Sequence, residues 1–263
     1  MKIEQLKLSR FRNLDDTCLR FHERGHLIIG DNGQGKTNLL EAIHYLTVLR
    51  SFRSQQDREC IRFGEETFHL EGNWEEEDGQ RETLSVGYSG KRKKVSLSGR
   101  VLEFVSEAFG RFKSIMLTPE DIAIVRGGPS ERRRHLDMLL SLVSPLYLER
   151  LKRYRKALAS RNVLLRRTPF SEEQADPWER QMAESGAWLI RERKDWLDKL
   201  EPEFTGLFKR LSGGEKGSLR YHNSLLARHI QDDSADVEHI AGVFAERLKK
   251  RRPVEREDRK SVV

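Results

Sequence analysis

Apolar and polar residues alternate with a period of two through much of the first half of the chain, which is the pattern of half-buried β-strands. Three early segments of this kind, the last of them a short β-branched run, lie at 3–8, 18–21 and 27–29. Three later segments, separated by charged turns, lie at 68–74, 83–88 and 94–98. A final apolar run at 114–117 predicts a buried strand that returns to the sheet. We therefore expect a mixed sheet in this half.

After about residue 125 the apolar positions change to the spacing of amphipathic helices. Capping residues, two of them followed by a proline suited to the first helical turn, predict three helix starts. They are Ser130, Ser144 before Pro145, and Asp176 before Pro177. The second and third helices are long and are joined by a loop near 168–169, so they predict an antiparallel hairpin.

Three regions follow from these patterns. We interpret 1–125, which carries a G-x-x-x-x-G-K-T phosphate-loop motif at 30–37, as the N-terminal part of a nucleotide-binding head and 126–211 as a helical arm domain. The third region, 212–263, predicts a strand at 218–222 and a helix over about 237–250, and we expect it to begin a return to the head.

The segment 30–37 has the sequence G-x-x-x-x-G-K-T of a phosphate-binding loop, and it stands between a strand pattern and a helix pattern. Its glycines allow backbone N–H groups to face an anion, and the helix start adds partial positive charge. Lys36 is placed to reach the β- and γ-phosphates, and Thr37 to offer its hydroxyl to Mg²⁺. A glycine-rich turn that only ends a strand is the alternative, but composition, order and flanks favour the nucleotide. The predicted nucleotide-binding residues are Gly30, Asp31, Asn32, Gly33, Gln34, Gly35, Lys36 and Thr37.

Composition limits the class of protein. The 263 residues suffice for one large domain or two smaller ones. The formal net charge of +7 favours a polyanionic partner, although solubility alone also explains a modest excess. The two cysteines lack the spacing of a zinc site or a disulfide framework. No apolar run has the length of a membrane span, and no signal peptide is recognisable, so we expect a cytoplasmic protein without a membrane part.

Basic residues gather at 151–170, a stretch that contains no aspartate or glutamate. Release of counterions from phosphates gives such a face affinity for DNA without sequence preference. The candidate DNA contacts are Lys152, Arg153, Arg155, Lys156 and Arg161. A solvated helix face is the alternative explanation, but the helix that follows is rich in glutamate and this one is not.

Taken in order, these motifs resemble the RecF family of recombinational-repair ATPases, which have a head of the ABC/SMC class. The resemblance covers nearly the whole chain, and the ordered set is far more specific than a phosphate loop alone. It rests on Phe11, Arg12 and Asn13, on 30–43, on 50–53, on 119–121 with Val125, Gly127 and Pro129, on 132–137, and on Pro145, Tyr147, Leu148, Tyr154, Ala157, Leu158, Arg161 and Asn162.

The resemblance implies an α/β fold, an ABC-type P-loop ATPase head with a mixed sheet and a helical arm. It also implies binding of ATP and Mg²⁺, ATP-dependent homodimerisation, and binding of single-stranded DNA and gapped duplex beside RecR and RecO. The implied roles are recombinase loading, replication-fork maintenance and SOS induction. RecF-like chains continue into a signature motif and a Walker B strand, so we expect a C-terminally truncated member that binds ATP without efficient hydrolysis. A binding module without hydrolysis and a generic P-loop phosphotransferase remain alternative functions.

Two segments resemble motifs that such enzymes carry at other places in their sequence. The segment 211–215, LSGGE, has the letters of an ABC signature, but a strand-like pattern follows it, so we interpret it as a turn that ends a helix. The run that ends in Glu120 and Asp121 is similar to a Walker B strand or a γ-phosphate-sensing loop. A capping pair at a turn explains these two carboxylates equally well.

Overall fold

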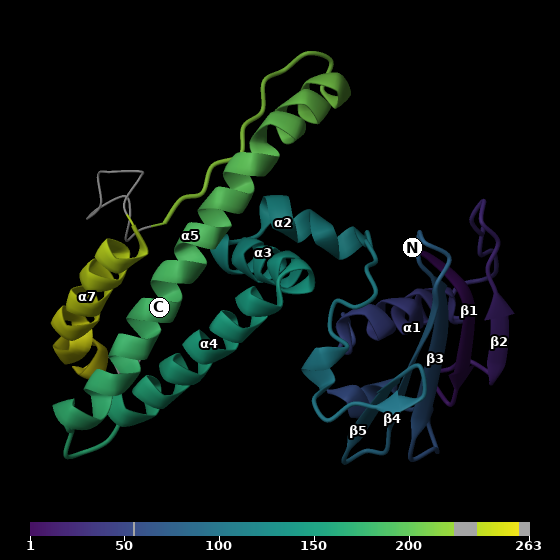
Figure 1. Cartoon of the computed structure of the whole chain (residues 1–263), viewed down its shortest axis with the longest axis horizontal. Coiled ribbons are helices and arrows are strands. Elements are labelled where there is room, and N and C mark those ends of the chain that lie inside the picture. The colour runs from purple at the N-terminus through teal and green to yellow at the C-terminus, as the bar shows by residue number, and fades with distance from the viewer. Residues whose placement is uncertain (55, 224–235, 258–263) are drawn as a thin grey trace. The chain divides into compact units, whose positions relative to one another are not determined.

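The computed structural model describes residues 1–54, 56–223 and 236–257, with the side chain of Glu120 excepted. The chain forms two compact units that divide between Gly127 and Gly128 (Figure 1). The division lies close to the boundary at 125 that the change of hydrophobic period predicts.

Six strands of the first unit form one sheet in the order β2-β1-β3-β4-β5-β6, and every pairing is antiparallel. Their bounds are Lys2–Ser9 for β1, Thr17–Arg20 for β2, Phe68–Glu75 for β3, Arg81–Tyr88 for β4, Lys93–Leu97 for β5 and Arg100–Val101 for β6. Alternate residues of β3 are buried, and helix α1 (Lys36–Val48) covers that face with Ala42, Tyr45 and Leu46 (Figure 1). The five strands predicted at the β1 to β5 positions are confirmed.

Two other predicted strands are wrong. The segments 27–29 and 114–117 pair with no described strand, and their apolar side chains are largely exposed. The exposed fractions are 84% for Leu27, 83% for Ile29, 99% for Ile115 and 89% for Leu117. A strand needs a neighbour to take its backbone hydrogen bonds, and an apolar run alone does not supply one. The parallel component that a mixed sheet requires is therefore not among the described pairings.

The first unit also contains short helices. A 3₁₀ turn at Asp57–Cys60 lies between α1 and β3, and the segment that follows β6 contains 3₁₀ turns at Val105–Glu107 and Pro119–Ile122 and the helix α2 at Ala123–Arg126.

The second unit is helical and contains α3 (Pro129–Val143), α4 (Pro145–Leu165), α5 (Glu172–Leu211) and α7 (Val237–Glu257). Helices α4 and α5 form the predicted hairpin, and α7 packs beside α5 (Figure 1). The predicted cap of α4 is confirmed, because Ser144 Oγ accepts a hydrogen bond of 3.1 Å from the Tyr147 backbone N–H.

Helix α5 begins one turn before the predicted start at Asp176. Its cap is Ser171, whose Oγ accepts from the Gln174 backbone N–H at 3.3 Å, and Pro177 lies inside the helix. Asp176 does not cap because its carboxylate accepts a hydrogen bond from Arg252 of α7 instead. The tertiary partner therefore overrides the local signal.

The described part of the third predicted region, 212–223 and 236–257, lies in the same compact unit as the helical arm. The strand predicted at 218–222 is wrong, because these residues follow α5 without regular secondary structure. Tyr221 packs against the cluster of Ala187 and Ile190. Helix α7 buries Ile240 and Leu248 in the same unit, so the described part of this region completes the helical core. None of the described helices has both the length and the apolar character of a membrane span.

Candidate nucleotide-binding site

The phosphate loop ends at the first residue of α1. Gly35 is the N-cap, with φ of 92°, and Gly33 has φ of 85°, both in the left-handed region that favours glycine. A Cβ on Gly35 would lie 2.4 Å from Leu14 Cδ2 and 2.9 Å from Asn13 Oδ1, so glycine is required by packing as well as by conformation. No side chain caps α1, which leaves its first backbone N–H groups available to an anion.

Lys36 lies across the loop. Its Nζ donates to the carbonyl oxygens of Gly30 and Asp31, at 2.7 Å each. Gln34 Oε1 accepts from the Asp31 backbone N–H at 3.2 Å, which closes the turn. Thr37, in the first turn of α1, is exposed. The loop thus brings together the ammonium, hydroxyl and N–H donors that the sequence predicts for phosphate and metal.

An amide chain outside the loop holds it in place. Asn13 Nδ2 donates to the Gly33 carbonyl oxygen at 2.8 Å, and Asn38 Nδ2 donates to Asn13 Oδ1 at 2.7 Å. Arg53 Nη1 in turn donates to Asn38 Oδ1 at 2.7 Å. Residues from three separate segments therefore fix the position of the loop.

A buried ion pair lies beneath this chain. Glu41 of α1 is 0% exposed and accepts from Arg12 Nε at 3.1 Å and from Arg12 Nη2 at 2.7 Å. Ser51 Oγ donates to the same carboxylate at 2.5 Å. A bidentate arginine pair has fixed geometry, so it locks α1 to the segment that carries Asn13. Burial raises the pKa of the neighbouring Cys60 thiol to about 11, which leaves it protonated and unreactive at neutral pH.

A cavity of about 480 Å³ adjoins the loop on the side of Asn13 and Asn38. Arg12, Arg53 and Arg62 contribute positive charge to its lining. Phe63, which also lines the cavity, is fully exposed. A large aromatic ring and arginine planes beside a phosphate loop are suited to stacking with a base.

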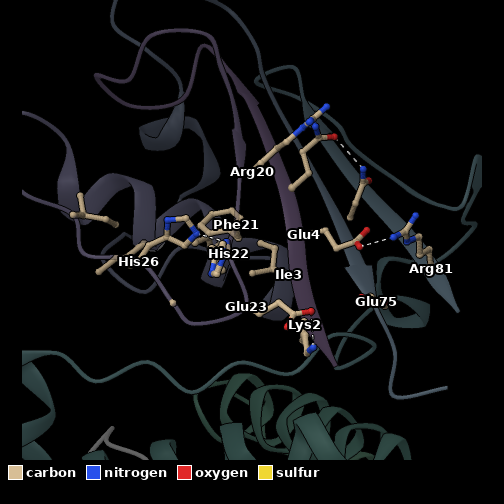
Figure 2. Close-up of a pocket in the computed structure, with 16 residues that line it drawn as sticks. Lys2, Ile3, Glu4, Arg20, Phe21, His22, Glu23, His26, Glu75 and Arg81 are labelled. Carbon is tan, nitrogen blue, oxygen red and sulfur yellow. Dashed lines mark hydrogen bonds and ion pairs between the residues drawn. The ribbon is translucent and has the colours of Figure 1, made fainter. Parts of the chain in front are cut away.

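A larger cavity of about 860 Å³ lies between β1, the segment after β2, and α1 (Figure 2). Two ion pairs lie within its lining: Lys2 Nζ is 3.1 Å from Glu23, and Arg81 is 2.8 Å from Glu4. Figure 2 shows Arg81 directed toward Glu4. Because no residue of the phosphate loop, 30–37, lines this cavity, we do not assign the phosphate site here.

The five predicted DNA contacts divide into three groups. Lys152, Arg153 and Lys156 are exposed on α4, and Arg153 forms a surface ion pair of 2.6 Å with Glu149. Arg155 is exposed but lies 3.6 Å from Asp137 of α3.

The predicted DNA contact of Arg161 is wrong, because its side chain is fully buried and cannot reach DNA. It donates to Glu179 at 2.9 Å, to Glu255 and to the Leu248 carbonyl oxygen. Its spacing of four residues from the buried Ala157 and Leu165 is the signal in the sequence that places it on the inner face.

The two motif-like segments behave as turns. Helix α5 ends at Leu211, and the Gly214 backbone N–H donates to the Lys209 carbonyl oxygen at 2.9 Å. The prediction that 211–215 is a turn that ends a helix is therefore confirmed. Asp121 Oδ2 accepts from the Thr118 backbone N–H at 2.6 Å, which is a capping contact. The side chain of Glu120 lies outside the described residues.

The sequence of this chain matches a known protein family. The family model described as RecF/RecN/SMC N terminal domain matches residues 2–229. The DNA replication and repair protein RecF of Prosthecochloris aestuarii is 37% identical over 243 residues, which cover 90% of this chain and 65% of that protein. RecF of Lachnospira eligens is 35% identical over 220 residues, which cover 81% and 60%. The chain thus spans 60–65% of the length of these relatives.

Solved structures of RecF proteins support the same family. A structure of the recombination mediator protein RecF-ATPrS in the RecFOR pathway superimposes with a TM-score of 0.92 at 31% identity, over 100% of this chain and 70% of that chain. The corresponding RecF-ATP structure gives 0.91 at 31% identity, over 99% and 70%. The predicted fold class, an ATPase head with a helical arm, is confirmed. The chain belongs to the RecF/RecN/SMC N-terminal domain family and, within it, to the RecF proteins.

Proposed function

We propose that this chain binds ATP at residues 30–37 and serves DNA replication and repair as the ATPase head and arm of a RecF protein. The observation that carries the proposal is the loop itself, in which Lys36 and the uncapped start of α1 face the same concave backbone. The solved relatives with RecF-ATP and RecF-ATPrS support the choice of nucleotide.

The roles of the loop residues follow from their chemistry. Backbone N–H groups of 33–37 hold the β-phosphate, and Lys36 exchanges its two carbonyl partners for β- and γ-phosphate oxygens. Thr37 is exposed in the first helical turn, so its hydroxyl is free to bind Mg²⁺ beside the phosphates. When bound, the metal neutralises phosphate charge. The cavity lined by Arg53 and Phe63 takes the nucleoside.

DNA is the second ligand of the proposed function. The exposed basic residues of α4, Lys152, Arg153 and Lys156, bind phosphates of single-stranded or gapped DNA without reading bases. Membership in the RecF family and the RecFOR pathway of the solved relative support RecR and RecO as partners, an ATP-dependent homodimer, and work in recombinase loading and SOS induction in the cytoplasm.

Nucleotide titration tests the proposal. Lys36→Ala should weaken ATP binding by more than about ten-fold, because the ammonium faces the phosphates. Lys113→Ala is the matched control, since Lys113 is exposed in the same unit and is not part of the loop. Equal ATP affinity in the two variants would remove the assignment of the loop as the nucleotide site.

A further inference from the structure

A cavity of about 410 Å³ lies inside the helical unit, where α3, α4, α5 and α7 meet. Positive charge dominates its lining, which includes five arginines and two carboxylates. The arginines are Arg133, Arg155, Arg193, Arg247 and Arg251, and the carboxylates are Asp137 and Glu255. Both carboxylates already have partners, because Asp137 accepts from Arg193 at 2.6 Å and Glu255 pairs with the buried Arg161. The excess charge therefore favours an anionic occupant.

The walls of the cavity are apolar and partly aromatic. Tyr154 of α4 and Phe244 of α7 line it and approach each other over Gly186 of α5. A Cβ at Gly186 would lie 2.4 Å from Phe244 and 3.1 Å from Tyr154, so the glycine allows both rings to reach this place. Burial raises the pKa of Tyr154 to about 12, so its hydroxyl is a neutral hydrogen-bond donor. Aromatic rings and arginines that line the same cavity are the combination that binds single-stranded nucleic acid.

The cavity is continuous with the basic face of α4. Arg155 lines the cavity, and Lys152 and Lys156 are its exposed neighbours on the same helix. An acidic peptide would also satisfy the arginines. However, the stretch 151–170 has no acidic residue, so the positive surface extends beyond the cavity, as a chain of phosphates requires.

We infer that this cavity takes up one unstacked nucleotide of a single-stranded DNA that lies along α4. The inference rests on the DNA-binding part of the proposed function. Arg133, which is exposed, contacts phosphate together with Arg251, which also lies 3.4 Å from Glu255, and Tyr154 and Phe244 contact the base. Duplex DNA binds the outer face of α4 but cannot fill the cavity, because its bases are paired and stacked.

An oligonucleotide titration of the full chain tests the inference. The probe is a single-stranded oligo-dT with one fluorescent adenine analogue at its centre, whose emission rises when it unstacks, and the reference is the duplex of the same length. The emission should rise when the single strand binds. Arg133→Glu should weaken single-strand binding about ten-fold and abolish the rise, with a smaller effect on the duplex. Arg134→Glu is the matched control, because this exposed neighbour does not line the cavity.

A second variant separates stacking from charge. Phe244→Leu keeps an apolar side chain in the core and changes no charge, and circular dichroism verifies its helices. It should abolish the emission rise while duplex affinity stays the same. Equal behaviour of Arg133→Glu and Arg134→Glu, or no emission change on binding, would overturn the inference. Competition of poly-glutamate for the cavity without any emission rise would also overturn it, in favour of an acidic peptide. If neither strand nor duplex binds, the proposed DNA function fails and the inference fails with it.

Discussion

Replacement of Arg161 by methionine should destabilise the helical unit, although this residue lies in the most basic stretch of α4. Arg161 is fully buried and donates to Glu179 at 2.9 Å and to Glu255. Removal of one partner from a buried ion pair costs about 3–5 kcal/mol, because it leaves a buried charge uncompensated. Glu179 keeps Arg252 at 2.6 Å and Glu255 keeps Arg251 at 3.4 Å. We therefore expect the lower end, a loss of about 3 kcal/mol in the free energy of unfolding.

Urea unfolding followed by tryptophan fluorescence measures this loss. Three of the four tryptophans, Trp178, Trp188 and Trp196, lie in α5, so the signal reports mainly the helical unit. The same loss lowers Tm by about 6–12 °C, at about 2–4 °C per kcal/mol for a chain of this size. Arg153→Met is the matched control, because its ion pair with Glu149 is at the surface and contributes at most about 1 kcal/mol.

For DNA binding we expect the opposite order of effects in these two variants. At a temperature where both variants are folded, Arg161→Met should bind DNA as the parent chain does, whereas Arg153→Met should bind more weakly and with a smaller salt dependence. The reasoning is refuted if Arg161→Met loses no more stability than Arg153→Met. In that case Arg161 would return as a candidate for direct DNA contact.

Three further predictions concern the head. Gly35→Ala should lower both stability and ATP affinity more than Gly99→Ala. Both glycines have positive φ, but only a Cβ at position 35 would press against other atoms. Urea unfolding and nucleotide titration of both variants measure the difference, and equal losses would contradict the packing argument. Thr37→Ala should reduce the enhancement of ATP binding by Mg²⁺ whereas Thr37→Ser should retain it, as measured by titration with and without the metal. Burial lowers the pKa of His44, and the charge of Arg50 lowers it further. The folded state therefore favours the neutral form of His44. The stability that this gives is fully present above the unfolded pKa of about 6.5, and it is lost as the pH falls through the lower folded pKa. His44→Gln should accordingly flatten the decline of stability between about pH 7 and pH 5 in urea titrations, and an unchanged decline would exclude His44 as its source.

Local signals in the sequence were sufficient for much of the fold. Period-two alternation predicts β1, β3 and β4 because these strands lie half-buried in one antiparallel sheet, where each face meets a different environment. Capping chemistry predicts the start of α4 because Ser144 and Pro145 act within a single turn. Both kinds of signal depend on neighbours in sequence, which is why they hold.

The failures arise where the deciding contact is distant. The apolar run 27–29 has strand composition, but a strand forms only with a partner that the run itself does not encode. Asp176 has capping chemistry, yet Arg252, far along the chain, takes its carboxylate. The same holds for the site: 30–37 is readable as a motif, whereas the support that Asn38 gives to Asn13 joins residues remote in sequence.

The charge of the chain illustrates the same limit in energetic terms. In the described part of the helical unit, Arg161, Arg193 and Arg252 are buried, and so are three carboxylates, Asp137, Glu179 and Glu255, which bind them. These buried groups offset one another, so they add nothing to the field that DNA meets, although the three arginines count fully in a tally of basic residues along α4, α5 and α7. The net charge of +7 is therefore carried by the remaining residues, most of them exposed. Because affinity for phosphates depends on the cations that a phosphate can reach, the exposed groups of α4 and the opening of the arginine-lined cavity define the DNA surface, and the basic stretch of sequence as a whole does not.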